Sequence, residues 1–221
     1  AIQLGIPVAR IELLDEVQIE AVNRYSHLHY PAVPTLFFEF HGTSAANLAE
    51  HVHSVEDLAA ENGGAGFQWA TTTEDRARLW HARHNAFYAA VALRPGGKAW
   101  TTDVCVPISR LAECILETRA DVQRSTLVAP LVGHVGDGNF HLIFVINPDN
   151  ASELAQVKEI NGRLVHRALA MGGTCSGEHG VGMGKMEYLL EEHGSEALDV
   201  MRSIKRALDP EHRMNPGKIF L

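Results

Sequence analysis

The 221-residue chain has few cysteines, few positive charges and no long apolar run. Its three cysteines, Cys105, Cys114 and Cys175, are odd in number and lack CxxC spacing, which favours a reducing compartment over a disulfide-bonded secreted protein. No apolar run approaches the roughly 20 residues of a membrane-spanning helix, and no signal peptide is visible. Lys and Arg number 19 against 27 Asp and Glu, and the formal net charge of −8 argues against nucleic acid as a partner.

The length and the hydrophobic content, 46%, are those of a folded globular chain of one domain or two small ones. No low-complexity linker or short repeat divides it. The chain begins with Ala1 rather than Met, inside an apolar segment, so we expect a piece of a longer protein. We treat residues 1–221 as one domain.

Apolar segments and helix-capping residues alternate along the chain, which predicts repeated strand–helix–strand units with a hairpin near the middle. Such an order predicts an α+β fold of the ferredoxin-like plait type: a largely antiparallel sheet, helices mainly on one face, and additional C-terminal helices. The expected strands are residues 8–14, 35–41, 66–70, 99–106, 126–132 and 142–146. The expected helices are residues 15–25, 44–62, 74–93, 109–124, 152–170, 186–192 and 196–208, with Asp15, Ser44 and Ser109 as caps.

The predicted hairpin carries two histidines. Asp137-Gly138 is a strong signal for a two-residue turn, in which both residues need positive φ. Such a turn would place His134 directly opposite His141, with Cβ atoms about 5 Å apart. Two imidazoles held in this way can bind one metal ion at about 2.1 Å each.

A glycine-rich stretch, residues 173–185, offers further ligands. Glu178 is a natural third ligand, and His179 is a titratable neighbour. His134, His141 and Glu178 would form a set of two histidines and one carboxylate, with positions open for water or substrate. Two simpler interpretations stay open: a histidine pair on a solvated strand face, and a plain loop between helices. Cys175 is either an alternative ligand or a small buried residue.

The same glycine-rich stretch does not fit a phosphate-binding loop. A P-loop needs a glycine five residues before Gly184, where His179 stands, and Ser or Thr after Lys185, where Met186 stands. No dinucleotide-binding fingerprint is met either, because no apolar strand leads directly into the glycines.

Three motifs in order resemble the C-terminal domain of FAD-linked oxidases, in the vanillyl-alcohol-oxidase type superfamily of flavoproteins. They are HVGDGNFH (134–141), SGEHGVGMGK (176–185) and LDPEHRMNPGKIF (208–220). TDVCVP (102–107) and VARIELL (8–14) narrow the resemblance to the cytochrome-linked D-lactate dehydrogenases. The resemblance covers nearly the whole chain. It implies that the N-terminal FAD-binding domain, with the first strand and much of the first helix of this cap domain, would precede residue 1.

The resemblance implies a role for this domain: binding substrate and a divalent metal (zinc, manganese or iron) in an FAD-dependent oxidation of D-lactate to pyruvate. His179 would take the hydroxyl proton of the substrate, and C2 would pass a hydride to FAD. Asn215 and Lys218 would lie where the tail returns to the flavin domain. Asn139 is expected to stabilise the hairpin.

One arginine is ambiguous from its spacing. Trp80, Arg83, Phe87 and Ala90 fall on one face of the helix predicted for residues 74–93, which places Arg83 in an aromatic stripe. An arginine extending from the edge of an apolar face is common, whereas a planar guanidinium also suits a carboxylate. The resemblance favours the second interpretation, in which Arg83 binds the substrate carboxylate.

Two departures from related enzymes bear on the substrate. Relatives that oxidise D-2-hydroxyglutarate carry an Asn and a Lys where this chain has Ile143 and Thr101, so a second carboxylate would lack partners. D-lactate is therefore expected, with glycolate or another D-2-hydroxy acid as alternatives.

The resemblance also implies partners: the protein's own FAD domain and an electron acceptor such as a cytochrome, a quinone or an electron-transfer flavoprotein; a homodimer is compatible with it. We expect a cytoplasmic or peripheral inner-membrane location in a bacterium and a mitochondrial one in a eukaryote. Two other classes compete with this assignment, a non-catalytic ferredoxin-like binding module and a self-contained metallohydrolase.

Overall fold

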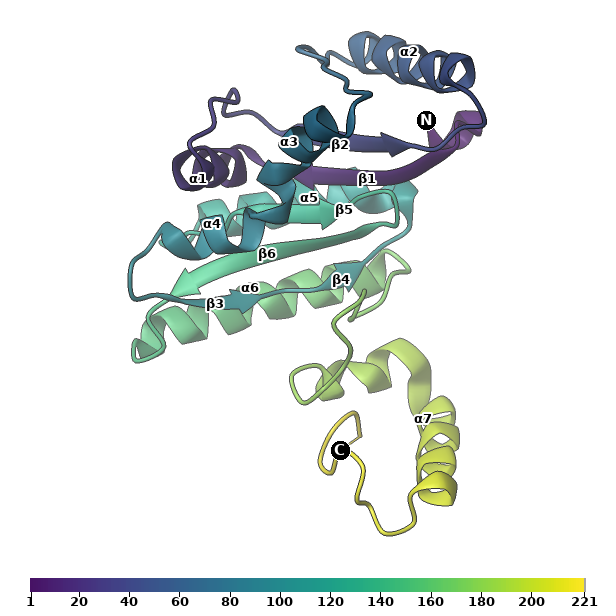
Figure 1. The fold of residues 1–221 in the computed structure, drawn as a ribbon. Helices are drawn as coiled ribbons and strands as arrows, with labels where there is room; N and C mark the ends of the chain where they lie inside the picture. The colour runs from purple at the N-terminus through teal and green to yellow at the C-terminus, as the bar shows by residue number, and fades with distance from the viewer. Residues whose placement is uncertain (221) are drawn as a thin grey trace.

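The apolar segments of the chain pair into one antiparallel sheet. A computed structural model describes residues 1–220, in which the strand order is β2-β1-β5-β6-β3 and β4 also pairs with β6 (Figure 1). Every pairing in this sheet is antiparallel, as expected. The strands are β1 (Val8–Leu14), β2 (Thr35–Phe40), β3 (Lys98–Thr101), β4 (Val104–Cys105), β5 (Leu131–His134) and β6 (Asn139–Ile146).

The helices begin close to the residues expected from capping chemistry. Asp15 and Ser44 each accept a hydrogen bond from the backbone N–H three residues later, as N-cap side chains do. Ser109 is not a cap, because its helix starts one residue after Pro107. The helices are α1 (Glu16–Ser26), α2 (Ala45–Glu61), α3 (Thr73–His84), α4 (Ala86–Ala92), α5 (Ile108–Gln123), α6 (Ala151–Ala170) and α7 (Leu189–Leu208), with 3₁₀ turns η1 (Ile2–Leu4) and η2 (Met186–Tyr188).

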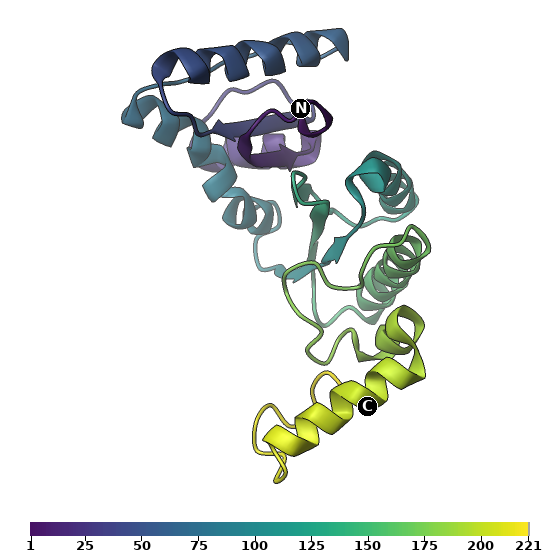
Figure 2. The same ribbon diagram turned by 90° about the vertical axis from the view of Figure 1, so that its right-hand side faces the viewer.

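The sheet is covered by helices on both faces. Every residue of β6 is buried: Phe140, Leu142 and Phe144 belong to the core that includes side chains of α5 and α6, and Ile143 packs with α1 and α4 on the opposite side. Figure 2, turned by 90° from Figure 1, shows the two helical layers on either side of the strands. The α+β class and the antiparallel sheet are confirmed; the helices are not gathered mainly on one face, because both faces of β6 need covering.

Several expected elements differ in the structure, and the strand expected over residues 99–106 is divided into β3 and β4. Residues 66–70 form no strand, and the helix expected over residues 74–93 is divided at Asn85, whose φ of −91° and ψ of 1° are not helical. The segment expected as strand 126–132 enters regular pairing only at Leu131. Pro130 has no N–H for the ladder, although its carbonyl accepts from Ile143 N at 2.9 Å.

The C-terminal part extends away from the sheet (Figures 1 and 2). Helix α7 is kinked at Gly194, where φ is 75°, and beyond the kink it exposes Val200, Ile204 and Leu208. The chain after α7 turns back, and Ile219 N donates to Gly182 O at 2.8 Å. No helix within residues 1–220 has the length and apolar character needed to cross a membrane.

Candidate metal and substrate site

The hairpin brings its two histidines together, but not by the register expected. Strand β5 ends at His134 and β6 begins at Asn139, so the loop has four residues; of Asp137 and Gly138, only Gly138 has positive φ (81°). His134 therefore faces Asn139, and His141 faces Val132. The prediction that His134 and His141 face each other directly is wrong. They are diagonal neighbours on the same face, with ring centroids 5.8 Å apart.

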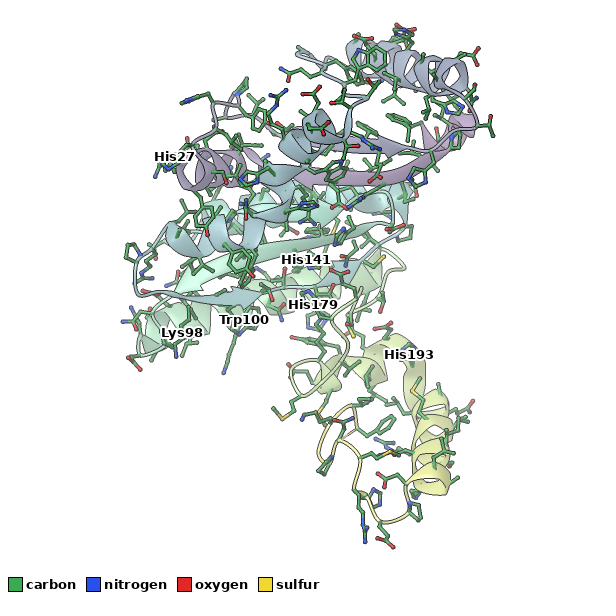
Figure 3. All side chains as sticks on the ribbon, viewed as in Figure 1. His27, Lys98, Trp100, His141, His179 and His193 are labelled. Atoms are coloured by element: carbon green, nitrogen blue, oxygen red, sulfur yellow. The ribbon has the colours of Figure 1, made fainter. Side chains whose placement is uncertain are left out.

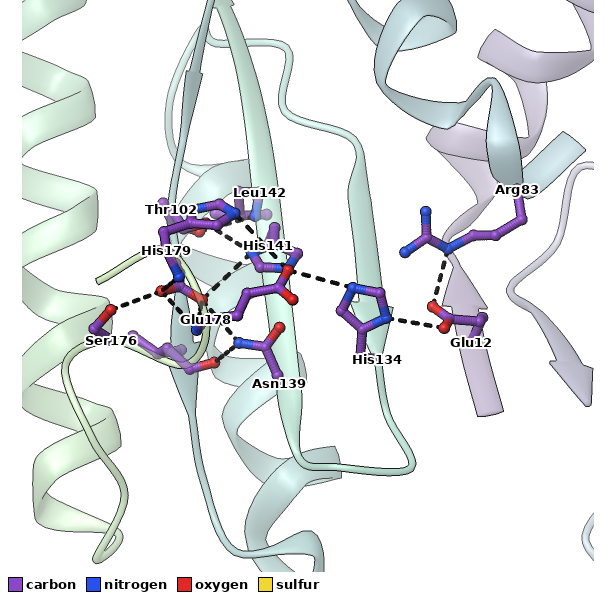
Figure 4. Close-up of polar contacts among 12 residues, drawn as sticks. Glu12, Arg83, Thr102, His134, Asn139, His141, Leu142, Ser176, Glu178 and His179 are labelled. Atoms are coloured by element: carbon purple, nitrogen blue, oxygen red, sulfur yellow. Dashed lines mark hydrogen bonds and ion pairs between the residues drawn. The ribbon is translucent and has the colours of Figure 1, made fainter. Parts of the chain in front are cut away.

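The glycine-rich loop after α6 brings Glu178 over this pair (Figure 4). Oε1 of Glu178 lies 3.0 Å from Nε2 of His141 and 3.3 Å from Nε2 of His134. One ligand atom from each of the three residues lies within 4.8 Å of the others, the spacing of a potential metal site. The structure thus brings together the three residues selected from the sequence as a ligand set.

The hydrogen bonds of His141 leave one nitrogen free to act as a ligand. His141 is 5% exposed, and its Nδ1 lies 3.0 Å from the carbonyl oxygen of Thr102, so Nδ1 carries the proton. Burial lowers the pKa of His141, which favours the neutral ring with a lone pair on Nε2. That buried Nε2 has no hydrogen-bond partner within residues 1–220, since its neighbour at 3.0 Å is a Glu178 carboxylate oxygen poorly aligned for a hydrogen bond. Two electron-pair donors facing each other fit a cation between them.

Glu12, on β1, is a member of the site that the sequence did not reveal. The residue is 3% exposed, and its carboxylate lies between two groups: Oε1 is 2.9 Å from Nδ1 of His134, and Oε2 accepts a hydrogen bond from Nε of Arg83 at 2.9 Å. Burial alone would raise the pKa of Glu12, but the hydrogen bond with His134 and the charge of Arg83 hold it below its usual range. The local signal was an acidic residue between Ile11 and Leu13 in a strand whose only other charged residue is Arg10, and this pattern does not specify what Glu12 contacts.

Arg83 does not lie in an aromatic stripe, and that prediction is wrong. Because the chain breaks at Asn85, Phe87 belongs to a different helix and is exposed, while Arg83 forms an ion pair with Glu12. Only Nε of its guanidinium donates a hydrogen bond to an acceptor within residues 1–220. The N–H groups of both terminal nitrogens are therefore available to another acceptor.

The loop that carries Glu178 is held by Asp103, a second residue that the sequence did not reveal. Asp103 is 1% exposed and accepts from five donor groups. Burial alone would raise the pKa of Asp103, but the hydrogen bonds from Asn139 and His179 N and the charge of Lys185 hold it well below its usual range. The donors are Asn139 Nδ2, Ser176 Oγ, Glu178 N, His179 N and Lys185 Nζ, at 2.8–3.2 Å.

Asp103 also belongs to a second possible ligand group, with His141 and His179, whose atoms lie within 4.8 Å of one another. The carboxylate oxygens of Asp103 are already occupied by N–H and O–H donors, whereas Nε2 of His141 points to Glu178. The group of His134, His141 and Glu178 is therefore the better cation site.

His179 lies against the site rather than in the ligand set. Its ring stacks on that of His141, with centroids 4.7 Å apart and an interplanar angle of 10°, and its Nε2 is 3.8 Å from Oε1 of Glu178. The side chain is 44% exposed. Figure 3 shows His141 and His179 side by side, with His27 and His193 far from them in other parts of the molecule.

Asn139 and Gly177 show how closely the hairpin and the loop approach each other. Asn139 Nδ2 donates to Asp103 and to Val104 O, so Asn139 ties the hairpin to β4 and the loop anchor. A Cβ atom on Gly177 would lie 1.9 Å from Asn139 Nδ2, a distance that no side chain tolerates. Gly177 is therefore required by this close approach, not by a left-handed backbone.

The remaining candidates lie outside the cluster. Asn215 and Lys218 are exposed on the C-terminal tail, and neither side chain hydrogen-bonds to another residue within 1–220. Cys175 is buried in the core and belongs to neither ligand group; burial raises the pKa of its thiol to about 12. Thr101 and Ile143 are partners in the β3–β6 register.

The chain is similar to known proteins over nearly its full length. Residues 1–219 match the family described as FAD linked oxidases, C-terminal domain. The chain is 53% identical to a probable mitochondrial D-lactate dehydrogenase of Danio rerio over 99% of its own length and 44% of the relative's. It is 45% identical to a mitochondrial D-lactate dehydrogenase [cytochrome] of Arabidopsis thaliana, over 98% of this chain and 38% of the relative. The chain thus spans less than half the length of these relatives.

A solved structure has a similar fold. A 4-ethylphenol oxidase from Gulosibacter chungangensis, in complex with isoeugenol, superposes with a TM-score of 0.67 at 14% identity, over 96% of this chain and 47% of that one. At this identity the likeness concerns the fold alone. The family match and the sequence relatives lead to one conclusion: the chain belongs to the FAD-linked oxidases, and residues 1–219 correspond to their C-terminal domain.

Proposed function

We propose that this chain is the substrate- and metal-binding domain of an FAD-dependent D-2-hydroxy acid dehydrogenase, and that the whole enzyme oxidises D-lactate to pyruvate. The observation that carries the proposal is the convergence of His134, His141 and Glu178, where the buried Nε2 of His141 has no hydrogen-bond partner among residues 1–220. The D-lactate dehydrogenases among the relatives support the choice of reaction.

His134, His141 and Glu178 would hold a divalent cation, and zinc, manganese and iron all suit two imidazoles and a carboxylate. When bound, the cation supplies a Lewis acid for the substrate hydroxyl, and FAD supplies the acceptor for the hydride from C2. Because the relatives are more than twice as long as the chain, we assign FAD binding mainly to a preceding domain, with Asn215 and Lys218 of the tail approaching it.

His179 is the proposed general base. It would take the hydroxyl proton of D-lactate as C2 loses hydride, which leaves the carbonyl group of pyruvate. Its ring is fixed against His141 by stacking and by the hydrogen bond from its own backbone N–H to Asp103 at 3.0 Å. Because the side chain is partly exposed, solvent can receive the proton afterwards.

Arg83 is the proposed partner of the substrate carboxylate. Its Nε donates a hydrogen bond to Glu12. Its two terminal nitrogens can donate two parallel hydrogen bonds to a substrate carboxylate, as in a bidentate pair. Holding the carboxylate in this way would orient C2. At Thr101 and Ile143 the chain has no cationic or amide side chain for a second carboxylate, which favours D-lactate over a dicarboxylic substrate.

The electron acceptor downstream is proposed to be a cytochrome, in keeping with the Arabidopsis relative, with a quinone or an electron-transfer flavoprotein as alternatives. The mitochondrial relatives favour a mitochondrial location if the source is a eukaryote.

The test uses the full-length protein, mixed anaerobically with D-lactate, glycolate, D-2-hydroxyglutarate and L-lactate while flavin absorbance is followed. We expect D-lactate to bleach the flavin fastest, Arg83→Lys to raise KM for D-lactate at least tenfold, and the present chain alone to show no turnover. Flavin reduction by D-2-hydroxyglutarate in preference to D-lactate would contradict the substrate. Metal-dependent hydrolysis by the chain alone, without a flavin, would point to a hydrolase instead.

A further inference from the structure

Glu12 joins two groups that the proposed function uses. One carboxylate oxygen lies 2.9 Å from Nδ1 of His134, and the other accepts from Nε of Arg83, also at 2.9 Å (Figure 4). The carboxylate reaches them from β1, which pairs with β5 in the register Leu13 with Gly133, so Glu12 stands beside His134 across the strands.

The contact with Glu12 determines which nitrogen of His134 can bind a cation. A carboxylate only accepts hydrogen bonds, so Nδ1 of His134 must carry the proton that Glu12 accepts. The lone pair of the neutral ring then lies on Nε2, the atom 3.3 Å from Glu178. An imidazole in the other tautomer would present an N–H to the cation and could not bind it.

The contact with Arg83 fixes the other group. The side chain of Arg83 is 18% exposed and that of Glu12 is 4% exposed, so the pair is largely shielded from solvent. Charge-assisted hydrogen bonds in such surroundings hold geometry well, because a shielded ion separated from its partner is strongly disfavoured. The same carboxylate thus restrains a ligand histidine and the guanidinium proposed to bind substrate.

We propose that Glu12 is a positioning residue, which holds His134 in the tautomer that presents Nε2 to the cation and holds Arg83 beside the same site. The inference rests on the proposed metal site, but not on the identity of the substrate.

The test measures Zn²⁺ affinity of the metal-stripped full-length protein by competition with a chromophoric chelator. Glu12→Gln keeps the shape of the side chain, but the amide has only one oxygen and cannot accept hydrogen bonds from both neighbours. Its NH2 group must therefore face a donor, either Arg83 or Nδ1 of His134. We expect Zn²⁺ affinity to fall about 10–100-fold, the usual effect of losing the hydrogen-bond partner of a ligand histidine. Glu39→Gln is the matched control, because Glu39 lies on the neighbouring strand and pairs with Arg10, away from the ligands. It should change the affinity less than about twofold.

A double-mutant cycle separates positioning from general damage. If Glu12 acts through His134, the double variant E12Q/H134A should bind Zn²⁺ no more weakly than H134A alone. Fully additive losses, or an unchanged affinity in E12Q while H134A loses Zn²⁺, would overturn the inference and leave the metal site intact.

Glu12→Asp covers the case in which Glu12→Gln does not fold, since it keeps the charge but withdraws the carboxylate from His134. We expect it to melt close to the wild type and to bind Zn²⁺ more weakly; wild-type affinity in this variant would contradict the proposal. An H134A variant with undiminished Zn²⁺ binding would instead remove the metal site, and with it both proposals.

Discussion

The contrast between His141 and Asp103 defines the candidate site at the scale of single residues. Both side chains are buried within the same cluster, yet Asp103 accepts hydrogen bonds from five donors, whereas Nε2 of His141 has no hydrogen-bond partner in the described part of the chain. Native proteins rarely bury a polar atom without a hydrogen-bond partner. The saturated carboxylate of Asp103 is therefore structural, whereas Nε2 of His141 is suited to binding a cation.

Replacing His141 by Ala should remove the bound metal. The ligand set would lose its most buried nitrogen, so we expect metal content of the full-length protein to fall from about one equivalent to near zero, with a rate loss of at least about 100-fold. Elemental analysis and D-lactate turnover measure the two effects. His166→Ala is the control, because His166 lies on the surface and pairs with Glu191 at 2.9 Å. Equal metal content in the two variants would remove His141 from the site.

Replacing Asp103 by Asn should destabilise the protein by about 3 kcal/mol, because a shielded Lys185 loses its partner and the amide faces other donors. The pKa of Asp103 is depressed in the folded protein, so its stabilising contribution is complete above the ordinary pKa near 4 and is lost as pH falls through the lower, folded value. The wild type should therefore lose stability below about pH 4 more steeply than D103N. Urea titrations between pH 2.5 and 7 measure this, and parallel pH curves would contradict it.

The sequence predicts the three candidate metal ligands but not the residues that support them. His134, His141 and Glu178 occur in dense motifs whose residue types have few other uses. Glu12 reaches His134 across 122 residues, and Asp103 reaches the N–H of His179 across 76. Such contacts depend on strand register and loop path, which no local pattern specifies, so neither Glu12 nor Asp103 could be identified before the fold was known.

At the scale of elements, the site is assembled from one hairpin and one glycine-rich loop. Asp103 and Asn139 join them, and the loop passes so close to Asn139 that only glycine fits at position 177. Glycine can let a backbone bend because it adopts positive φ without strain. Gly180 and Gly182 do have positive φ, whereas Gly177 is needed for space.

Replacing Gly177 by Ala should therefore displace the loop. The new Cβ would collide with Asn139 and Asp103, and we expect a destabilisation of about 1–3 kcal/mol together with weaker Zn²⁺ binding. Gly184→Ala is a matched control in the same loop, since a Cβ there would have no heavy atom within 4 Å and φ is not positive. Its effect should stay within about 0.5 kcal/mol. Chemical denaturation measures the free energy of unfolding, and chelator competition measures the Zn²⁺ affinity. Equal values for the two variants would refute the close approach of Gly177 to Asn139.

The start of α1 makes a separate prediction about pH. Asp15 caps the helix but is buried, and burial raises its pKa to about 6. Because the folded pKa lies above the unfolded one, stability should fall as pH rises from about 4 to 6 and stay lower above that. Asp15→Asn keeps a cap of similar quality, so at pH 8 it should stabilise the protein by about 2 kcal/mol and at pH 4 hardly at all. Thermal melting at both pH values measures this; a destabilised variant at pH 8 would contradict it.

Most helices and strands could be predicted from hydrophobic periodicity and helix-capping residues, and the errors have local causes. The helix expected over residues 74–93 has no Pro or Gly to signal the break at Asn85, whose side chain turns back to the carbonyl of His81. The hairpin loop was predicted two residues too short, because Asp137-Gly138 also fits a four-residue turn in which only the glycine has positive φ. The histidines still meet, since a shift of two residues in the partner keeps every side chain on its own face.

At the scale of the whole molecule, the chain spans less than half of its relatives. The three residues of the candidate cation site nevertheless all lie within this one domain: two in the sheet and one in the loop. We therefore expect the metal to depend on this domain and the redox chemistry to depend on the remainder of the protein.

The most direct measurement is anomalous diffraction from crystals of the full-length protein at the absorption edge of the metal found by elemental analysis. We expect one peak at about 2.0–2.2 Å from Nε2 of His134, Nε2 of His141 and a carboxylate oxygen of Glu178. A peak coordinated by Asp103 and His179 instead, or no peak near the two hairpin histidines, would contradict it.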